Sequence, residues 1–191
     1  MATAAPSPHA GWVFNQSGIR VSNLEKSISF YQEVLGLSLL QKVQADTFTI
    51  AFMGYVPGGV DNPGLELDRE GIVELIWSET SGPLITNSKT HDGFGFIKLM
   101  FTVPDIMSAM EHMKKFGVKV LKYPGTTDEA SLDVVARAIG AEPSGKGRNQ
   151  GFWHFVGPIA FVEDPDGYYI ELMQQDHAKN SLPKMRNENL A

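Results

Sequence analysis

Residues 14–37 read FNQSGIRVSNLEKSISFYQEVLGL, and this stretch decides the fold. Phe14 to Val21 has the length and apolar content of a short strand. Asn23 follows as a helix N-cap, because its side chain can accept hydrogen bonds from the free amides of a first helical turn. Gly36 ends the helix, since glycine adopts the left-handed C′ conformation at low cost. Between them the apolar side chains recur on one helical face: Leu24, Ile28, Tyr31 and Leu35.

Three strand-like segments follow this helix, at Leu37 to Val43, Phe48 to Tyr55 and Ile72 to Trp77. Two glycine- and proline-rich turns separate the last two, at Pro57-Gly58-Gly59 and Asn62-Pro63-Gly64. The first part of the chain is therefore predicted to run strand, helix and three strands.

The same order returns later in the chain. Phe96 to Val103 has the pattern of a strand, Asp105 that of an N-cap, and Gly117 that of a helix end. The helical stripe between them is Ile106, Met110 and Met113. Three strands are expected next, at Val118 to Lys122, Pro158 to Glu163 and Tyr168 to Met173. A repeat of this kind predicts two βαβββ modules.

The repeat also predicts how the chain is divided. We expect a flexible N-terminus at 1–11, a first module at 12–81, a linker at 82–92, a second module at 93–176 and a polar tail at 177–191. The second module carries an insertion at 125–157, in which Ser131 to Gly140 is predicted to form a small helix. The insertion can be interpreted as a lid over a binding site or as a surface decoration.

Composition excludes several classes of protein. The 191 residues suffice for one domain or two half-domains, and the absence of cysteine excludes disulfides, thiolate metal ligands and a thiol nucleophile. The formal charge is −6 and no basic stripe is present, which argues against nucleic acid as a partner. No apolar run approaches the ~18 residues of a membrane span. The N-terminus lacks the pattern of a signal peptide, so we expect a cytoplasmic protein with no membrane partner.

Four motifs stand in a characteristic order: Lys26-Ser27-Ile28-Ser29-Phe30-Tyr31 with Val34-Leu35-Gly36-Leu37, then Gly93-Phe94-Gly95, Val103-Pro104-Asp105, and Asp164-Pro165-Asp166-Gly167-Tyr168-Tyr169-Ile170-Glu171. Their order and spacing resemble the glyoxalase I (lactoylglutathione lyase) family of the vicinal oxygen chelate superfamily. The resemblance covers residues 12–176. It implies the α+β glyoxalase/bleomycin-resistance/dioxygenase fold, in which paired βαβββ modules form a cupped, barrel-like sheet. It also implies a homodimer.

The resemblance further implies a metal site on the first and last strands of the modules, with the ligands Gln or His, Glu, His and Glu. The first, second and fourth positions match Gln16, Glu74 and Glu171. The third, a histidine in the family, is matched to Phe96, which cannot bind a metal. The implied cofactor is a divalent metal (Zn, Ni, Mg or Mn), and an all-oxygen set suits Mg²⁺ or Mn²⁺ better than the other two.

Lys98 lies two residues after Phe96 and thus on the same face of the predicted strand. A buried ammonium needs an anionic partner, and Glu74 and Glu171 are the anions expected nearby. One interpretation is that Lys98 partly replaces the positive charge of the metal. The other is that its amine extends to the rim and only its stem is packed.

The resemblance also implies a substrate-binding set. Arg20 matches a position at which the family grips a glutathione carboxylate through paired hydrogen bonds, and Lys122 matches another glutathione-contacting position. Asp92 stands where the family has an arginine, which argues against glutathione as the substrate. The predicted substrate-binding residues are Arg20, Phe96, Lys122 and Trp77.

The implied reaction moves a proton next to a carbonyl, which needs a base and a positive group for the enediolate oxygen. The resemblance assigns the base to Glu171 and the partner carboxylate to Glu74. We expect a metal or Lys98 to hold the oxyanion. We therefore expect a glyoxalase I-like lyase or isomerase, specialised or biosynthetic, acting on a small, carboxylate-bearing substrate. Two alternatives stay open: an authentic glyoxalase I acting on the methylglyoxal–glutathione hemithioacetal with an altered metal site, and a non-catalytic small-molecule-binding member of the superfamily.

Overall fold

A computed structural model describes residues 11–56, 69–79, 84, 96–141 and 150–180, with the side chains of 150 and 151 left out. The predicted turns at 57–64, the Gly93-Phe94-Gly95 motif, Asp92 and nearly all of the predicted linker lie outside these residues. The chain divides into two compact units, Met1–Gly82 and Pro83–Ala191.

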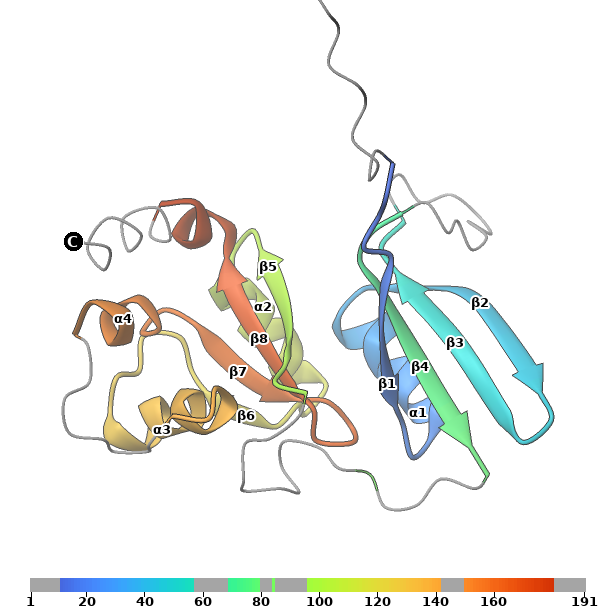
Figure 1. The fold of residues 1–191 in the computed structure, drawn as a ribbon. Coiled ribbons are helices and arrows are strands. Elements are labelled where there is room, and N and C mark those ends of the chain that lie inside the picture. The colour runs from blue at the N-terminus through green and yellow to red at the C-terminus, as the bar shows by residue number, and fades with distance from the viewer. Residues whose placement is uncertain (1–10, 57–68, 80–83, 85–95, 142–149, 181–191) are drawn as a thin grey trace, which may run out of the picture. The chain divides into compact units, whose positions relative to one another are not determined.

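The first unit is a four-stranded sheet with a helix on one face (Figure 1). Its elements are β1 (Gln16–Arg20), α1 (Leu24–Ser29), the π-helical turn η1 (Phe30–Val34), β2 (Ser38–Ala45), β3 (Phe48–Gly54) and β4 (Ile72–Ser78). The strand order is β1-β4-β3-β2. β1 runs parallel to β4, and the other neighbours are antiparallel. This order places the first and last strands of the unit side by side.

The capping signals of the first helix are confirmed. The Asn23 side chain accepts a hydrogen bond from the Lys26 amide at 3.0 Å. Gly36 takes a φ of +75°, the left-handed conformation that ends the helical segment. All four residues of the predicted stripe are buried: Leu24, Ile28, Tyr31 and Leu35. The helix therefore covers one face of the sheet. The candidate site residue Glu74 stands on the opposite face.

The second unit repeats this topology. Its elements are β5 (Leu99–Val103), α2 (Ile106–Lys115), β6 (Val120–Lys122), α3 (Glu129–Ala138), α4 (Gln150–Phe155), β7 (Ala160–Glu163) and β8 (Tyr169–Gln174). The strand order is β5-β8-β7-β6, again with a parallel first pair. Asp105 caps α2 by accepting from the Ser108 amide at 2.7 Å. The predicted stripe of α2 is buried: Ile106, Met110 and Met113.

The α+β fold is confirmed, and three details differ from the prediction. The strands of the predicted cupped, barrel-like sheet form two four-stranded sheets, which are not closed into a barrel. The strand predicted from Phe96 begins only at Leu99. The described residues of the insertion form two helices, the predicted α3 and a second helix, α4. Helix α4 has only six residues, which is too short for a helical stripe to be recognised in the sequence.

The insertion helices share a core with the second sheet. Buried side chains of α3 and α4 pack together with Phe161 of β7 and Met173 of β8. The others in this cluster are Leu132, Val135, Ala138, Phe155, Val156 and Ile159. Both described helices are thus built into the unit, which does not fit a surface decoration. Within the described ranges, no helix has the length and hydropathy that crossing a membrane requires.

Candidate functional site

Glu74 is the third residue of β4 and stands on the sheet face opposite α1. The strand register places it beside Gly18 of β1 and Phe52 of β3. Gln16, two residues before Gly18, donates from Nε2 to Glu74 Oε2 at 2.9 Å. A Cβ added at Gly18 would lie 3.1 Å from Glu74 Oε2, so this glycine gives the carboxylate its room. The two predicted ligands of the first unit therefore meet.

The surroundings of this pair are apolar. Leu40, Phe52 and Ile72 form a buried cluster on the first sheet. Gln16 Oε1 is buried, and it has no hydrogen-bond donor among the described residues. Leaving a buried acceptor without a hydrogen bond costs free energy. A donor or a cation from outside the unit that bound this oxygen would remove that cost.

Glu171 is the third residue of β8 and is only 3% exposed. The register places it beside Met100 of β5 and Phe161 of β7. The Lys98 amine forms an ion pair with Glu171 Oε2, and it lies 5.8 Å from the centroid of the Phe161 ring. The predicted contact of Lys98 with Glu171 is therefore present, and a buried carboxylate has an internal ammonium as its counter-ion.

The internal repeat shows which residues of the two units correspond. Gly18 stands beside Glu74 in the first unit, and Met100 stands beside Glu171 in the second. Gln16 and Lys98 each lie two residues before that neighbour and contact the adjacent carboxylate. Lys98 is thus the counterpart of Gln16. In this comparison of the two units, Lys98 and not Phe96 holds the place that Gln16 holds in the first unit.

Phe96 precedes strand β5 and is not part of the sheet. It is 42% exposed, and its ring meets Tyr168 edge-on with 5.9 Å between centroids. Because Phe96 and Lys98 both precede the first residue of β5, strand alternation does not set their directions. The Lys98 side chain is 28% exposed, and burial lowers the pKa of its amine. Lys98 thus keeps one side open while its amine contacts Glu171.

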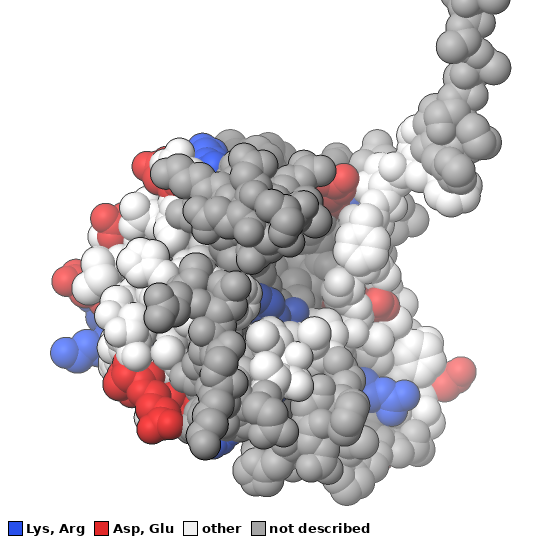
Figure 2. Space-filling view, turned by 60° about the vertical axis from the view of Figure 1, so that its left-hand side comes forward, with Lys and Arg blue, Asp and Glu red and all other residues white. Residues whose placement is uncertain are grey.

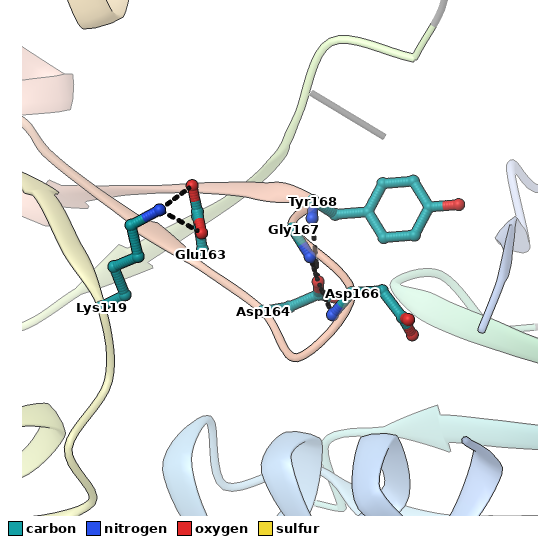
Figure 3. A network of polar contacts seen from close by, with 6 residues as sticks. All are labelled: Lys119, Glu163, Asp164, Asp166, Gly167 and Tyr168. Atoms are coloured by element: carbon teal, nitrogen blue, oxygen red, sulfur yellow. Dashed lines mark hydrogen bonds and ion pairs between the residues drawn. The ribbon is translucent and has the colours of Figure 1, made fainter. Parts of the chain in front are cut away.

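A tight turn between β7 and β8 precedes Glu171 in the chain, and Figure 3 shows the hydrogen bonds of this turn. The buried Asp164 carboxylate accepts from the backbone amides of Asp166, Gly167 and Tyr168 through Oδ1, each at 2.9 Å. Gly167 takes a φ of +92°, which favours glycine. These bonds hold the hairpin in one register, and this register sets Glu171 opposite Phe161. The sequence motif from Asp164 to Glu171 therefore forms a turn that fixes the position of the Glu171 carboxylate.

Figure 3 also shows an ion pair beside this hairpin. Lys119 Nζ lies 3.0 Å from both carboxylate oxygens of Glu163, the last residue of β7. The Lys119 side chain is 67% exposed. A pair whose lysine is this exposed contributes little to stability, so these two residues serve below as controls.

Lys122 has partners other than the predicted substrate. The residue is 1% exposed, and its amine donates to the carbonyls of Tyr123, Gly157 and Ile159 at 3.2, 2.7 and 2.8 Å. An ammonium has three donors, and all three are used. Burial lowers the pKa of Lys122 to about 8, and Asp128 opposes this shift. Lys122 therefore joins the two ends of the insertion and is not part of the site that we propose.

The remaining predicted residues lie in the first unit. Arg20 ends β1 and lies on the same strand face as Gln16, because the two are four residues apart in one strand. Trp77 is three residues after Glu74 in a strand of regular register, which puts the two on opposite faces of the sheet. Arg20 is thus retained as a substrate-binding candidate, and Trp77 is not.

Charged side chains do not gather into one patch on the face seen in Figure 2. Lys and Arg side chains lie singly between acidic and uncharged ones on the coloured part of that face.

The predicted metal ligands come from both units, Gln16 and Glu74 from the first and Glu171 from the second. Among the described residues, no three His, Cys, Asp or Glu side chains come together as a group that could hold a metal ion. Gln16 and Glu74 offer two oxygens that would suit a hard cation. In the second unit the Lys98 ammonium already contacts Glu171, and its charge repels a further cation there. The residues of the second unit therefore do not fit a divalent metal.

Comparison with known proteins adds independent evidence. A family model described as the Glyoxalase/Bleomycin resistance protein/Dioxygenase superfamily matches residues 11–172. A probable lactoylglutathione lyase of Synechocystis is 33% identical, over 85% of this chain and 95% of that protein. A lactoylglutathione lyase of Schizosaccharomyces pombe is 30% identical over 92% of this chain but 52% of that protein, so the chain spans about half the length of this relative.

Solved structures agree. The trypanothione-dependent glyoxalase I of Leishmania major has a TM-score of 0.58 and 25% identity, covering 94% of this chain and 99% of that one. Glyoxalase I of Zea mays has a TM-score of 0.55 at 22% identity, covering 92% of this chain and 50% of that one, and shares the fold. The chain therefore belongs to the Glyoxalase/Bleomycin resistance protein/Dioxygenase superfamily, and its relatives include glyoxalase-type lyases.

Proposed function

We propose that this chain is a glyoxalase-like lyase or isomerase that moves a proton next to a carbonyl group, with Glu171 as the base. The observation that carries the proposal is the buried Glu171 carboxylate with the Lys98 amine against it. A general base must be held where it can reach a carbon-bound proton, and it works best where water is excluded. The Asp164 turn and the Phe161 ring supply that fixed, apolar setting.

The substrate that we propose is a small carbonyl compound that carries a carboxylate. Arg20 on the first unit is the candidate for binding this carboxylate, since a guanidinium grips such a group with two parallel hydrogen bonds. Gln16 and Glu74 are the proposed polar partners of the substrate in the first unit, with the free Gln16 Oε1 as an acceptor. We further propose that the chain acts as a homodimer, as the family resemblance implies.

A second candidate is authentic glyoxalase I activity on the methylglyoxal–glutathione hemithioacetal. The observation in its favour is the name lactoylglutathione lyase on relatives about one-third identical. Lys122, predicted to contact glutathione, argues against it, because its three donors are engaged by carbonyls within its own unit.

Proton exchange tests the proposal. Purified chain in D₂O is incubated with the methylglyoxal–glutathione hemithioacetal or with a panel of small 2-oxo and 2-hydroxy carboxylates, and NMR follows the loss of the carbon-bound proton. We expect exchange with a carboxylate of the panel, and a loss of roughly 100-fold or more in the Glu171→Gln variant.

Glu163→Gln is the matched control. It neutralises a carboxylate in the neighbouring strand whose partner is the exposed Lys119, and it should leave the exchange rate unchanged. Exchange of the hemithioacetal alone would favour authentic glyoxalase I. Full exchange in the Glu171→Gln variant, or binding of panel compounds without any exchange, would refute the proposed reaction.

A further inference from the structure

We propose that Lys98 takes the place of a metal ion in this site: its ammonium holds the substrate oxygen on which negative charge develops, so the protein binds its ligand without a divalent cation. This inference rests on the proposed role of Glu171 as the base.

The first step of the argument is position. Lys98 is the second unit's counterpart of Gln16, the residue matched to a metal ligand in the first unit. Each side chain reaches the carboxylate of the adjacent last strand, Glu74 or Glu171. The neutral amide of Gln16 leaves room for a cation beside Glu74. The Lys98 ammonium, in contrast, itself supplies the positive charge beside Glu171. The same place in the repeat therefore holds a covalently attached positive charge.

The second step is the movement of charge during the reaction. In the resting state the ammonium of Lys98 is balanced by the carboxylate of Glu171. When Glu171 takes a proton from the carbon next to the carbonyl, the C–H electron pair forms a carbon–carbon double bond. The carbonyl π electrons then move to oxygen. Negative charge thus leaves Glu171 and appears on the substrate oxygen, and the ammonium can follow it over a short distance.

This arrangement stabilises the transition state more than the ground state, which is the requirement for catalysis. The Glu171 side chain is 4% exposed, and the Lys98 amine lies over the Phe161 ring, so the exchange takes place in surroundings of low polarity. The Lys98 side chain is 28% exposed, which leaves a side from which a substrate oxygen can approach. The ligand class that follows is a carbonyl compound able to form an enolate or enediolate.

Oxalate tests this inference, because it is a dianion with adjacent oxygens like an enediolate. The full-length protein is stripped with EDTA, its metal content is checked by mass spectrometry, and oxalate binding is measured by calorimetry. We expect the stripped protein to bind oxalate, Lys98→Met to weaken binding at least tenfold, and Lys98→Arg to stay within tenfold of the unsubstituted protein. Lys119→Met, an exposed lysine of the same unit, should have no effect.

Lys98→Met leaves Glu171 buried without a counter-ion and can destabilise the fold. The double variant Lys98→Met with Glu171→Gln removes both charges, and it too should bind at least tenfold more weakly. Failure of the stripped protein to bind oxalate, with or without restoration by Mn²⁺, would overturn the inference. So would unchanged binding in the double variant. Because binding requires no turnover, these results are independent of whether Glu171 acts as a base.

Discussion

Replacing Lys122 with methionine is a direct test of how the insertion is attached to the second sheet. The Lys122 amine reaches carbonyls at both ends of the insertion, from Tyr123 at its start to Gly157 and Ile159 at its end. Methionine keeps an apolar stem of similar length and removes only the charged donor. The variant therefore isolates the contribution of these hydrogen bonds.

The magnitude follows from what each carbonyl retains. Tyr123 O still accepts from the Thr126 hydroxyl at 2.7 Å, and Gly157 O still accepts from the Gly125 amide at 2.9 Å. The main loss is the bond to Ile159 O, and a hydrogen bond from a charged group contributes about 1.5–3 kcal/mol. Because methionine also avoids the desolvation of an ammonium, we expect a net loss of about 2 kcal/mol in the free energy of unfolding.

Urea denaturation followed by circular dichroism measures this loss. With a slope of about 2 kcal/mol/M, the midpoint should fall by roughly 1 M. Lys119→Met is the control, since the Lys119 side chain is exposed and its loss should change stability by less than about 1 kcal/mol. If Lys122→Met and Lys119→Met had the same midpoint, the three carbonyl contacts would not be holding the insertion.

Other predictions concern pH, the turn and a helix cap. The pKa of Lys122 is about 8 in the folded protein and near 10.5 in the unfolded chain, so between these pH values the unfolded chain binds more protons. The stability of the unsubstituted protein relative to Lys122→Met should therefore rise from pH 8 to pH 10.5 in urea titrations. A stability difference that stays flat or falls would contradict the lowered pKa. Asp164→Ala removes the acceptor of three buried amides and should cost about 2–4 kcal/mol in urea unfolding, and a loss below about 1 kcal/mol would show that the turn forms without it. Asn23→Ala removes the N-cap of α1 and should cost about 1 kcal/mol, Asn23→Ser should restore most of this, and equal midpoints for the two variants would argue against the cap.

The fold was predictable where local signals and the repeat agree. Asn23 and Asp105 cap their helices as expected, because an N-cap needs only a side-chain oxygen next to free amides. The stripes of the two helices are buried, because helical spacing puts their residues on one face. Helix α4 has six residues, which is too few for such a stripe to be recognised in the sequence.

The site was predictable only in part, because side-chain partners depend on register. The family resemblance matched Phe96 to the third ligand position. The register of β5 with β8 sets Met100 beside Glu171, and Lys98, two residues before Met100, contacts this carboxylate. Counting back from the helix N-caps would have identified Lys98 as the counterpart of Gln16, because both stand at the same distance before the N-caps of their helices. Lys122 was predicted to bind substrate because it matches a family position, and its carbonyl partners Gly157 and Ile159 could not be foreseen because they lie far away in sequence.

The affinity of the Glu171→Gln variant for oxalate tests the central claim most directly. If the Lys98 ammonium is the anion-holding group, removing its internal counter-ion frees it, and metal-free Glu171→Gln should bind oxalate at least tenfold more tightly than the unsubstituted protein. If Glu171 instead serves as a metal ligand, oxalate binding should depend on added Mn²⁺ in the unsubstituted protein as well, and the same change should weaken it. Tighter, metal-independent binding is the result that we predict, and weaker, metal-dependent binding would contradict the account.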